Sequence, residues 1–165
     1  MRLERAARDG MMGAMEPAKA PLSNKELFGR CEQVLAWWLI GCIKAEEVVA
    51  WADRMIQKAG SPESLPYWLM ELSLQGPEPL YRSPDRDLPR PKQMSYSEEF
   101  RARVECTNPN DDESVGRFAK WAAGAAMGED LDAEEVRVGY AIEHAISYEN
   151  SGDPIEIARE AVRAM

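Results

Sequence analysis

Apolar residues recur every three or four positions along most of the chain, which is the spacing of one face of an α-helix. The clearest stretch starts at Ser23 and Glu26, which have the spacing of a capping box, and continues through Leu27, Cys31 and Val34. Apolar residues on its other sides predict a central helix that is buried on several faces. The sequence contains no alternating apolar and polar run longer than four residues. The pattern therefore predicts an all-α protein.

Start signals divide the rest of the pattern into further helices. Asp111 or Asp112, the pair Asp132 and Glu135, and Asp153 each precede an apolar stripe with helical spacing. We expect an irregular helical bundle of about six helices, from stretches at about 23–40, 45–59, 66–75, 111–127, 132–148 and 153–165, with a short additional helical stretch at 97–105.

Glycine and proline divide the chain into four segments. Residues 1–21 lack a sustained apolar stripe and are expected to be a disordered tail. Residues 22–75 form an N-terminal three-helix subdomain, and residues 96–165 form an acidic C-terminal helical subdomain that shares one core with it. Between them, residues 76–95 contain five prolines and predict a long, extended, proline-rich connector. Its basic residues would wrap over the acidic helices or present an extended peptide to a partner.

Composition and cysteine content favour a cytoplasmic protein. The chain has 165 residues, of which 45% are hydrophobic and 30% are charged, as is usual for a globular protein. Its longest apolar run, 34–43, is about half the length that a membrane span needs, and the first ten residues lack the apolar region of a secretory signal. The odd number of widely spaced cysteines, Cys31, Cys42 and Cys106, predicts core residues in a reducing compartment.

The net charge of −9 is concentrated in the C-terminal half. Residues 96–165 hold 7 basic and 16 acidic residues, and the rest of the chain is balanced. Many of these carboxylates fall at helix starts, where the helix dipole favours them, so solvated helix faces are one interpretation. The other is a negative surface that attracts a basic protein partner. Direct nucleic-acid binding and binding to an anionic membrane are both disfavoured, because each requires a basic surface.

The sequence contains no recognisable catalytic motif, and we expect no cofactor and no metal ion. It lacks a Gly-x-Ser-x-Gly elbow, a phosphate-binding loop and a Cys-x-x-Cys pair. A single histidine, His144, excludes a di-iron site within one chain. A small enzyme with a metal or metabolite site made of dispersed carboxylates and His144 stays an alternative. Its first candidates are Glu143, His144 and Glu149, with Glu46 or Asp53 opposite.

The chain holds five tryptophans, which is many for its length. Adjacent Trp37 and Trp38 cannot face the same way on a helix, so either the helix is sandwiched or one indole reaches the surface. We therefore expect a non-enzymatic acidic helical protein–protein binding module. Neutralisation of a basic partner, in the manner of a toxin-immunity protein, is one form that its function would take. A structural scaffold that oligomerises is a further alternative. The candidate binding residues are Glu129, Asp130, Asp132, Glu134, Glu135, Trp37 and Trp121.

Overall fold

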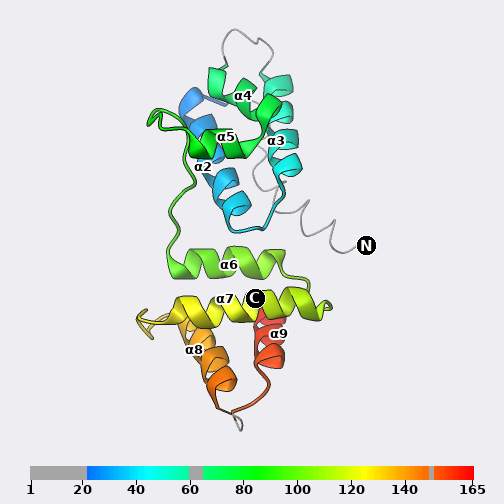
Figure 1. The fold of residues 1–165 in the computed structure, drawn as a ribbon, viewed down its shortest axis with the longest axis vertical. Coiled ribbons are helices and arrows are strands. Elements are labelled where there is room, and N and C mark those ends of the chain that lie inside the picture. Colours follow the sequence, from blue (N-terminus) through cyan, green and yellow to red (C-terminus); the bar gives the residue numbers. More distant parts are fainter. Residues whose placement is uncertain (1–21, 60–64, 149–150) are drawn as a thin grey trace. The chain divides into compact units, whose positions relative to one another are not determined.

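The computed structural model describes residues 22–59, 65–148 and 151–165 (Figure 1). These residues form eight helices and no strand, which confirms the all-α class. The expected number of about six helices was too low. The expected tail at 1–21 lies outside the described residues. Within the described part of the chain, no helix is long and apolar enough to cross a membrane.

Contacts between helices divide the chain into two compact units. Among the described residues, one unit ends at Gln93 and the other begins at Met94. The segment 76–93 therefore belongs with the N-terminal helices. The shared core expected for the two helical halves stays a prediction.

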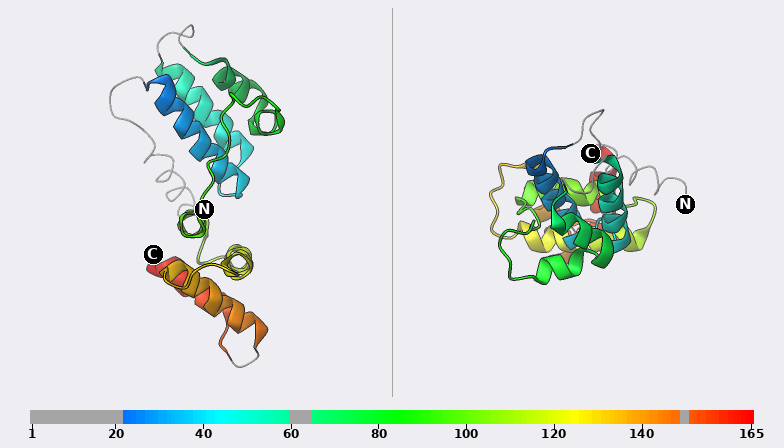
Figure 2. Two further views of the ribbon diagram at one scale, coloured as in Figure 1. Left: turned by 90° about the vertical axis from the view of Figure 1, so that its left-hand side faces the viewer. Right: turned by 90° about the horizontal axis from the view of Figure 1, so that it is seen from above.

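The first unit is built from α2 (Asn24–Leu39), α3 (Ala45–Lys58), α4 (Tyr67–Gln75) and α5 (Pro77–Arg82). The helices α2 and α3 run side by side, and α4 packs against α3 (Figures 1 and 2). Apolar residues from these helices are buried, as the helical spacing predicts. They include Leu27, Cys31, Val34, Leu35, Val48, Trp51, Ala52, Trp68, Leu69 and Leu72.

The proline-rich segment is not a simple extended connector. Gly76 has a φ of 79°, which ends α4, and Pro77 opens α5 from its first turn, where no backbone donor is needed. Leu80 in α5 is buried, and so are Leu88 and Pro89 beyond it. The prediction of an extended connector was wrong for residues 77–82, because proline is compatible with the start of a helix.

Arg90 holds the rest of this segment in a compact shape. Its Nη1 atom donates to the carbonyl oxygens of Leu80 (3.2 Å) and Tyr81 (2.8 Å). Its Nη2 atom donates to those of Ser83 and, at 2.7 Å, Asp85. This basic side chain therefore closes a loop in its own segment.

The second unit contains α6 (Tyr96–Cys106), α7 (Asp112–Ala126), α8 (Glu134–Ser147) and α9 (Pro154–Ala164). The helices α6 and α7 lie side by side, and both are viewed end-on in the left panel of Figure 2. The helices α8 and α9 form a hairpin that packs against α7 (Figure 1). Their common core contains Phe100, Val104, Val115, Phe118, Ala119, Ala122, Ala123, Ile142 and Ala158.

Most of the start signals are confirmed. The Ser23–Glu26 capping box is formed, Asp111 accepts a hydrogen bond from the Glu113 amide, and Asp153 caps α9. The predicted box of Asp132 and Glu135 was wrong, because Ala133 is the N-cap of α8 and makes no side-chain cap.

Candidate functional site

One acidic exposed feature of the second unit is the loop of residues 127–133, between α7 and α8. Its backbone turns at Gly128, whose φ of 91° is readily adopted only by glycine. The Gly128 amide donates to the Tyr140 hydroxyl oxygen (3.1 Å), and the Glu129 amide donates to the Ala126 carbonyl oxygen (3.0 Å). The first half of the loop is thus fixed to both helices.

The second half of the loop is fixed by a turn and by an arginine. The Asp132 amide donates to Oδ1 of Asp130 at 3.3 Å, which is an Asx turn. Arg137 in α8 donates from Nη1 to the carbonyl oxygens of Leu131 (3.4 Å) and Asp132 (3.3 Å). A loop that is ordered in this way loses less conformational entropy when it binds a partner.

Four of the five carboxylates that the sequence singled out are exposed. Glu129, Asp130 and Asp132 lie in the loop, and Glu134 follows in the first residue of α8. Within the described residues, none of the four forms a salt bridge. Their charges face solvent over a short stretch of chain, next to the N-terminus of α8.

Glu135, the fifth carboxylate, has a different environment. Its side chain is only 5% exposed, and Oε1 accepts a hydrogen bond from Nε of Arg101 in α6 at 2.6 Å. Its own backbone amide, the Arg101 guanidinium and the Ser97 hydroxyl together lower the pKa of Glu135, against the opposing effect of burial. The structure thus places Glu135 in an ion pair between α6 and α8 rather than on the acidic surface.

Two apolar side chains stand among the exposed carboxylates. Met127 is 62% exposed and Leu131 is 55% exposed. Exposed apolar groups surrounded by charges are typical of binding surfaces, since they contribute contact area at the centre while the charges form the rim. In the sequence, Met127 and Leu131 flank the acidic residues Glu129 and Asp130. This apolar pair could have indicated the surface, but the sequence-based prediction used the charges alone.

Trp121, a candidate binding residue, takes part in an aromatic cluster of the core. Its ring stacks on Tyr96, with centroids 5.4 Å apart and an interplanar angle of 9°. The guanidinium carbon of Arg103 lies 4.5 Å from the centre of the same ring, and Phe100 and Phe118 adjoin it. These ring contacts give half-buried Trp121 a packing role in the core of the unit. Its role as a binding residue stays a prediction.

Tyr96 connects this cluster to the start of α8. Its hydroxyl lies within donating distance of the carbonyl oxygens of Ala122 (3.2 Å) and Glu135 (3.3 Å). Burial, together with the carboxylates of Glu135 and Glu129, raises the pKa of Tyr96 to about 12. The hydroxyl is therefore a stable hydrogen-bond donor between three helices.

Trp37 lies half-buried in α2, in the other unit from the acidic loop. Its neighbour Trp38 makes an edge-on contact with Tyr81, with centroids 5.9 Å apart. Adjacent positions on a helix point about 100° apart, so Trp37 projects from α2 in another direction than Trp38.

The described residues of the alternative enzyme site belong to two units, with Glu46 and Asp53 in the first and Glu143 and His144 in the second. Among the described residues, no three His, Cys, Asp or Glu side chains lie close enough to hold a metal ion. His144 is exposed in α8, where its ring contacts Tyr148 at a centroid distance of 4.5 Å. Asp53 accepts a hydrogen bond from the Ser73 hydroxyl, and Glu149 lies outside the described residues.

The thiol of Cys31 is a core group. The residue is fully buried in α2, and burial, with a smaller effect of Glu32, raises the pKa of the thiol. A raised pKa keeps the thiol protonated and weakly reactive. Cys31 has a free thiol, so the prediction of reduced core cysteines is confirmed for this cysteine alone.

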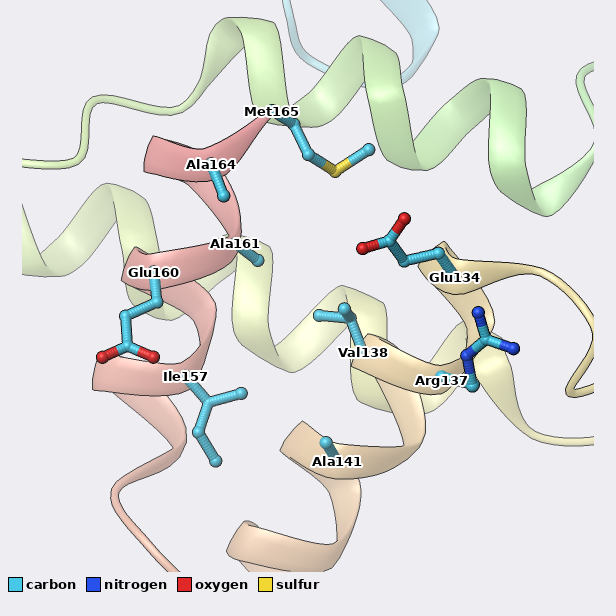
Figure 3. Close-up of a pocket in the computed structure, with 9 residues that line it drawn as sticks. All are labelled: Glu134, Arg137, Val138, Ala141, Ile157, Glu160, Ala161, Ala164 and Met165. Carbon is cyan, nitrogen blue, oxygen red and sulfur yellow. The ribbon is translucent and has the colours of Figure 1, made fainter.

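Sequence reasoning missed a groove of about 460 Å³ that runs between α8 and α9 (Figure 3). Val138 and Ile157 extend into the space between the two helices, and Met165 and Glu134 lie at the same end of it. Alanines at positions 141, 161 and 164 leave the groove open, because each carries a single methyl group. This run of small residues on facing helices was the available signal.

Comparisons with protein-family models, with curated proteins and with solved structures found no match to this chain. The geometry of the chain's own residues therefore carries the functional argument.

Proposed function

We propose that this chain is a non-enzymatic, acidic, helical protein-binding module that docks on a basic protein partner through the loop between α7 and α8. Neutralisation of a basic enzyme, such as a nuclease-type toxin, is one form that this activity would take.

The observation that carries the proposal is the loop itself. It combines exposed carboxylates with exposed Met127 and Leu131 on a backbone that hydrogen bonds hold in place. A cluster of negative charge accelerates the encounter with a basic surface, by about 10–10³-fold in known cases. The two apolar side chains then supply contact area that is independent of salt.

The test compares the tagged wild-type protein with a Glu129→Lys/Asp132→Lys variant in an extract of the source cells. Asp130 is left unchanged, because its carboxylate holds the Asx turn. A matched control, Glu71→Lys/Glu105→Lys, changes the net charge equally at exposed positions outside the loop. Captured proteins are identified by mass spectrometry at low and high salt.

We expect the wild type and the control to retain one basic protein at low salt and to release it at about 1 M salt, where charges are screened within about 3 Å. The loop variant should lose that protein at low salt. Capture of the same protein by the loop variant, with an unchanged salt profile, would contradict the proposal.

A self-associating scaffold is a second candidate, and one observation favours it. Tyr67, Met70 and Leu74 share the outer face of α4 and are 58%, 39% and 80% exposed. Sedimentation of the wild type and of Leu74→Glu at high salt tests this function. An oligomer that persists in salt and dissociates in the variant is expected for a scaffold, and a monomer at all concentrations excludes it.

A further inference from the structure

The groove between α8 and α9 is long enough for about two turns of one helix. On α8 it is lined by Glu134, Arg137, Val138 and Ala141. Their spacing of i, i+3, i+4 and i+7 places them on one face of the helix. Facing them on α9 are Ile157, Glu160, Ala161 and Ala164, with the same spacing. The lining residues of each helix span seven residue steps, which correspond to about 10 Å, or two helical turns.

The interior of the groove is apolar, and its rim is mainly acidic. Six of the nine lining residues are apolar, so a ligand must bring apolar groups to fill the groove. Glu134 on α8 and Glu160 on α9 are the two acidic residues among those that line the groove. The guanidinium of Arg137 donates to carbonyl oxygens of the acidic loop, so it is already engaged there.

Glu134 belongs to both features, because it continues the acidic loop and lines the groove. The loop surface and the groove therefore adjoin at Glu134, and one partner would contact both. A second copy of this chain is a poor occupant, since the 96–165 segment carries a net charge of −9 and would repel itself.

We propose that the α8–α9 groove binds an amphipathic helix of the basic partner, with its apolar residues in the groove and a Lys or Arg at Glu134. This proposal rests on the proposed function, and it specifies the partner's binding element. Apolar anchors at i, i+4 and i+7 would lie over Val138, Ala161 and Ala164, as in other helix-in-groove complexes.

The test uses the full chain and two fluorescent synthetic peptides of about 15 residues, a length at which an isolated helix is marginal and forms on binding. One peptide places leucines at helical spacing on a lysine and alanine background. The other has the same composition in scrambled order, and therefore the same charge. Binding is measured by fluorescence anisotropy.

Ala161→Phe fills the groove, and Ala141→Leu fills it from the other wall should the first variant fold poorly. Ala50→Phe, at an exposed position on α3, is the matched control. Far-UV circular dichroism verifies that each variant keeps the helical content of the wild type.

We expect the periodic peptide to bind at least about tenfold more tightly than the scrambled one, because only the periodic peptide can present one apolar face. Ala161→Phe and Ala141→Leu should remove this difference, and Ala50→Phe should keep it. Glu134→Gln should weaken the periodic peptide severalfold at low salt.

Equal binding of both peptides, unaffected by filling the groove and reduced by Glu129→Lys/Asp132→Lys, would overturn the groove site and leave the acidic docking loop standing. If both peptides bind equally, and if neither the groove variants nor Glu129→Lys/Asp132→Lys change their affinity, both proposals are overturned.

Discussion

Glu134 and Glu135 are neighbours in the sequence and have opposite roles in the structure. Glu134 faces solvent at the start of α8, whereas Glu135 is buried and bonded to Arg101. Successive residues on a helix point about 100° apart, so one of the pair turns to the core when the other faces outward. The sequence could not show which one, because Arg101 lies 34 residues away in another helix.

Replacement of Glu135 by Gln should destabilise the protein in a pH-dependent manner. Its pKa is lowered in the folded state, so its charge stabilises the fold above the unfolded pKa of about 4.3. This contribution disappears as the pH falls through the lower folded pKa. At pH 7 we expect the free energy of unfolding to fall by about 1–3 kcal/mol, as for other buried hydrogen-bonded groups.

Urea unfolding of the wild type and of Glu135→Gln, measured from pH 7 down to pH 3, checks this expectation. The difference should be largest at pH 7 and shrink in acid. Glu134→Gln, on the same turn of α8, is the control and should show no comparable loss. A constant difference at all pH values would show that the charge of Glu135 is not the cause.

At the scale of the helices, hydrophobic spacing and caps predicted most of the architecture. The helix starts at Ser23, Asp111 and Asp153 follow from local side-chain hydrogen bonds, so they are visible in a short window of sequence. The helix α5 was missed because proline suggested an extended chain. The α8–α9 groove was missed because a groove depends on how two helices pack, which no local pattern determines.

The packing of α8 on α7 depends on Gly139. A Cβ atom at this position would lie 2.7 Å from Cβ of Ala126 and 2.9 Å from the carbonyl oxygen of Ala122, and also against the Tyr96 hydroxyl. These distances are too short, and backbone must move to relieve them. The two helices are therefore in contact because one of them lacks a side chain here.

Gly139→Ala should lower the free energy of unfolding by about 1–3 kcal/mol, the usual cost of overpacking, although alanine favours helix formation. Gly124→Ala is the matched control, because beyond its own stretch of α7 no atom lies within 4 Å of the position that its Cβ would take. The control should be more stable by about 0.5–1 kcal/mol. Thermal unfolding measures both, and stabilisation by Gly139→Ala would contradict the close contact.

At the scale of the whole molecule, the chain forms two units, and the second contains the candidate site. The core around Phe100, Phe118 and Ile142 draws all of its members from α6 to α9. The acidic loop, the Glu135 ion pair and the groove are built on the same four helices. The sequence composition had indicated that the excess negative charge lies in this half of the chain. It did not indicate that the helices of this half enclose a core of their own.

We expect residues 94–165 to fold when expressed alone, because their core is internal to the unit. Circular dichroism should show a helical spectrum and a cooperative thermal transition. A domain of this size is marginally stable, so a lower melting temperature than that of the full chain is acceptable. An unfolded fragment would favour the alternative, a single core shared by both halves.

The proposed function requires the acidic loop to recognise a basic protein. The most direct measurement is the association rate constant of the captured partner with the wild type and with Glu129→Lys/Asp132→Lys, by stopped flow over a range of salt concentrations. We expect the variant to associate at least about tenfold more slowly at low salt, and the two rates to converge at high salt. Equal rates at every salt concentration would contradict the claim.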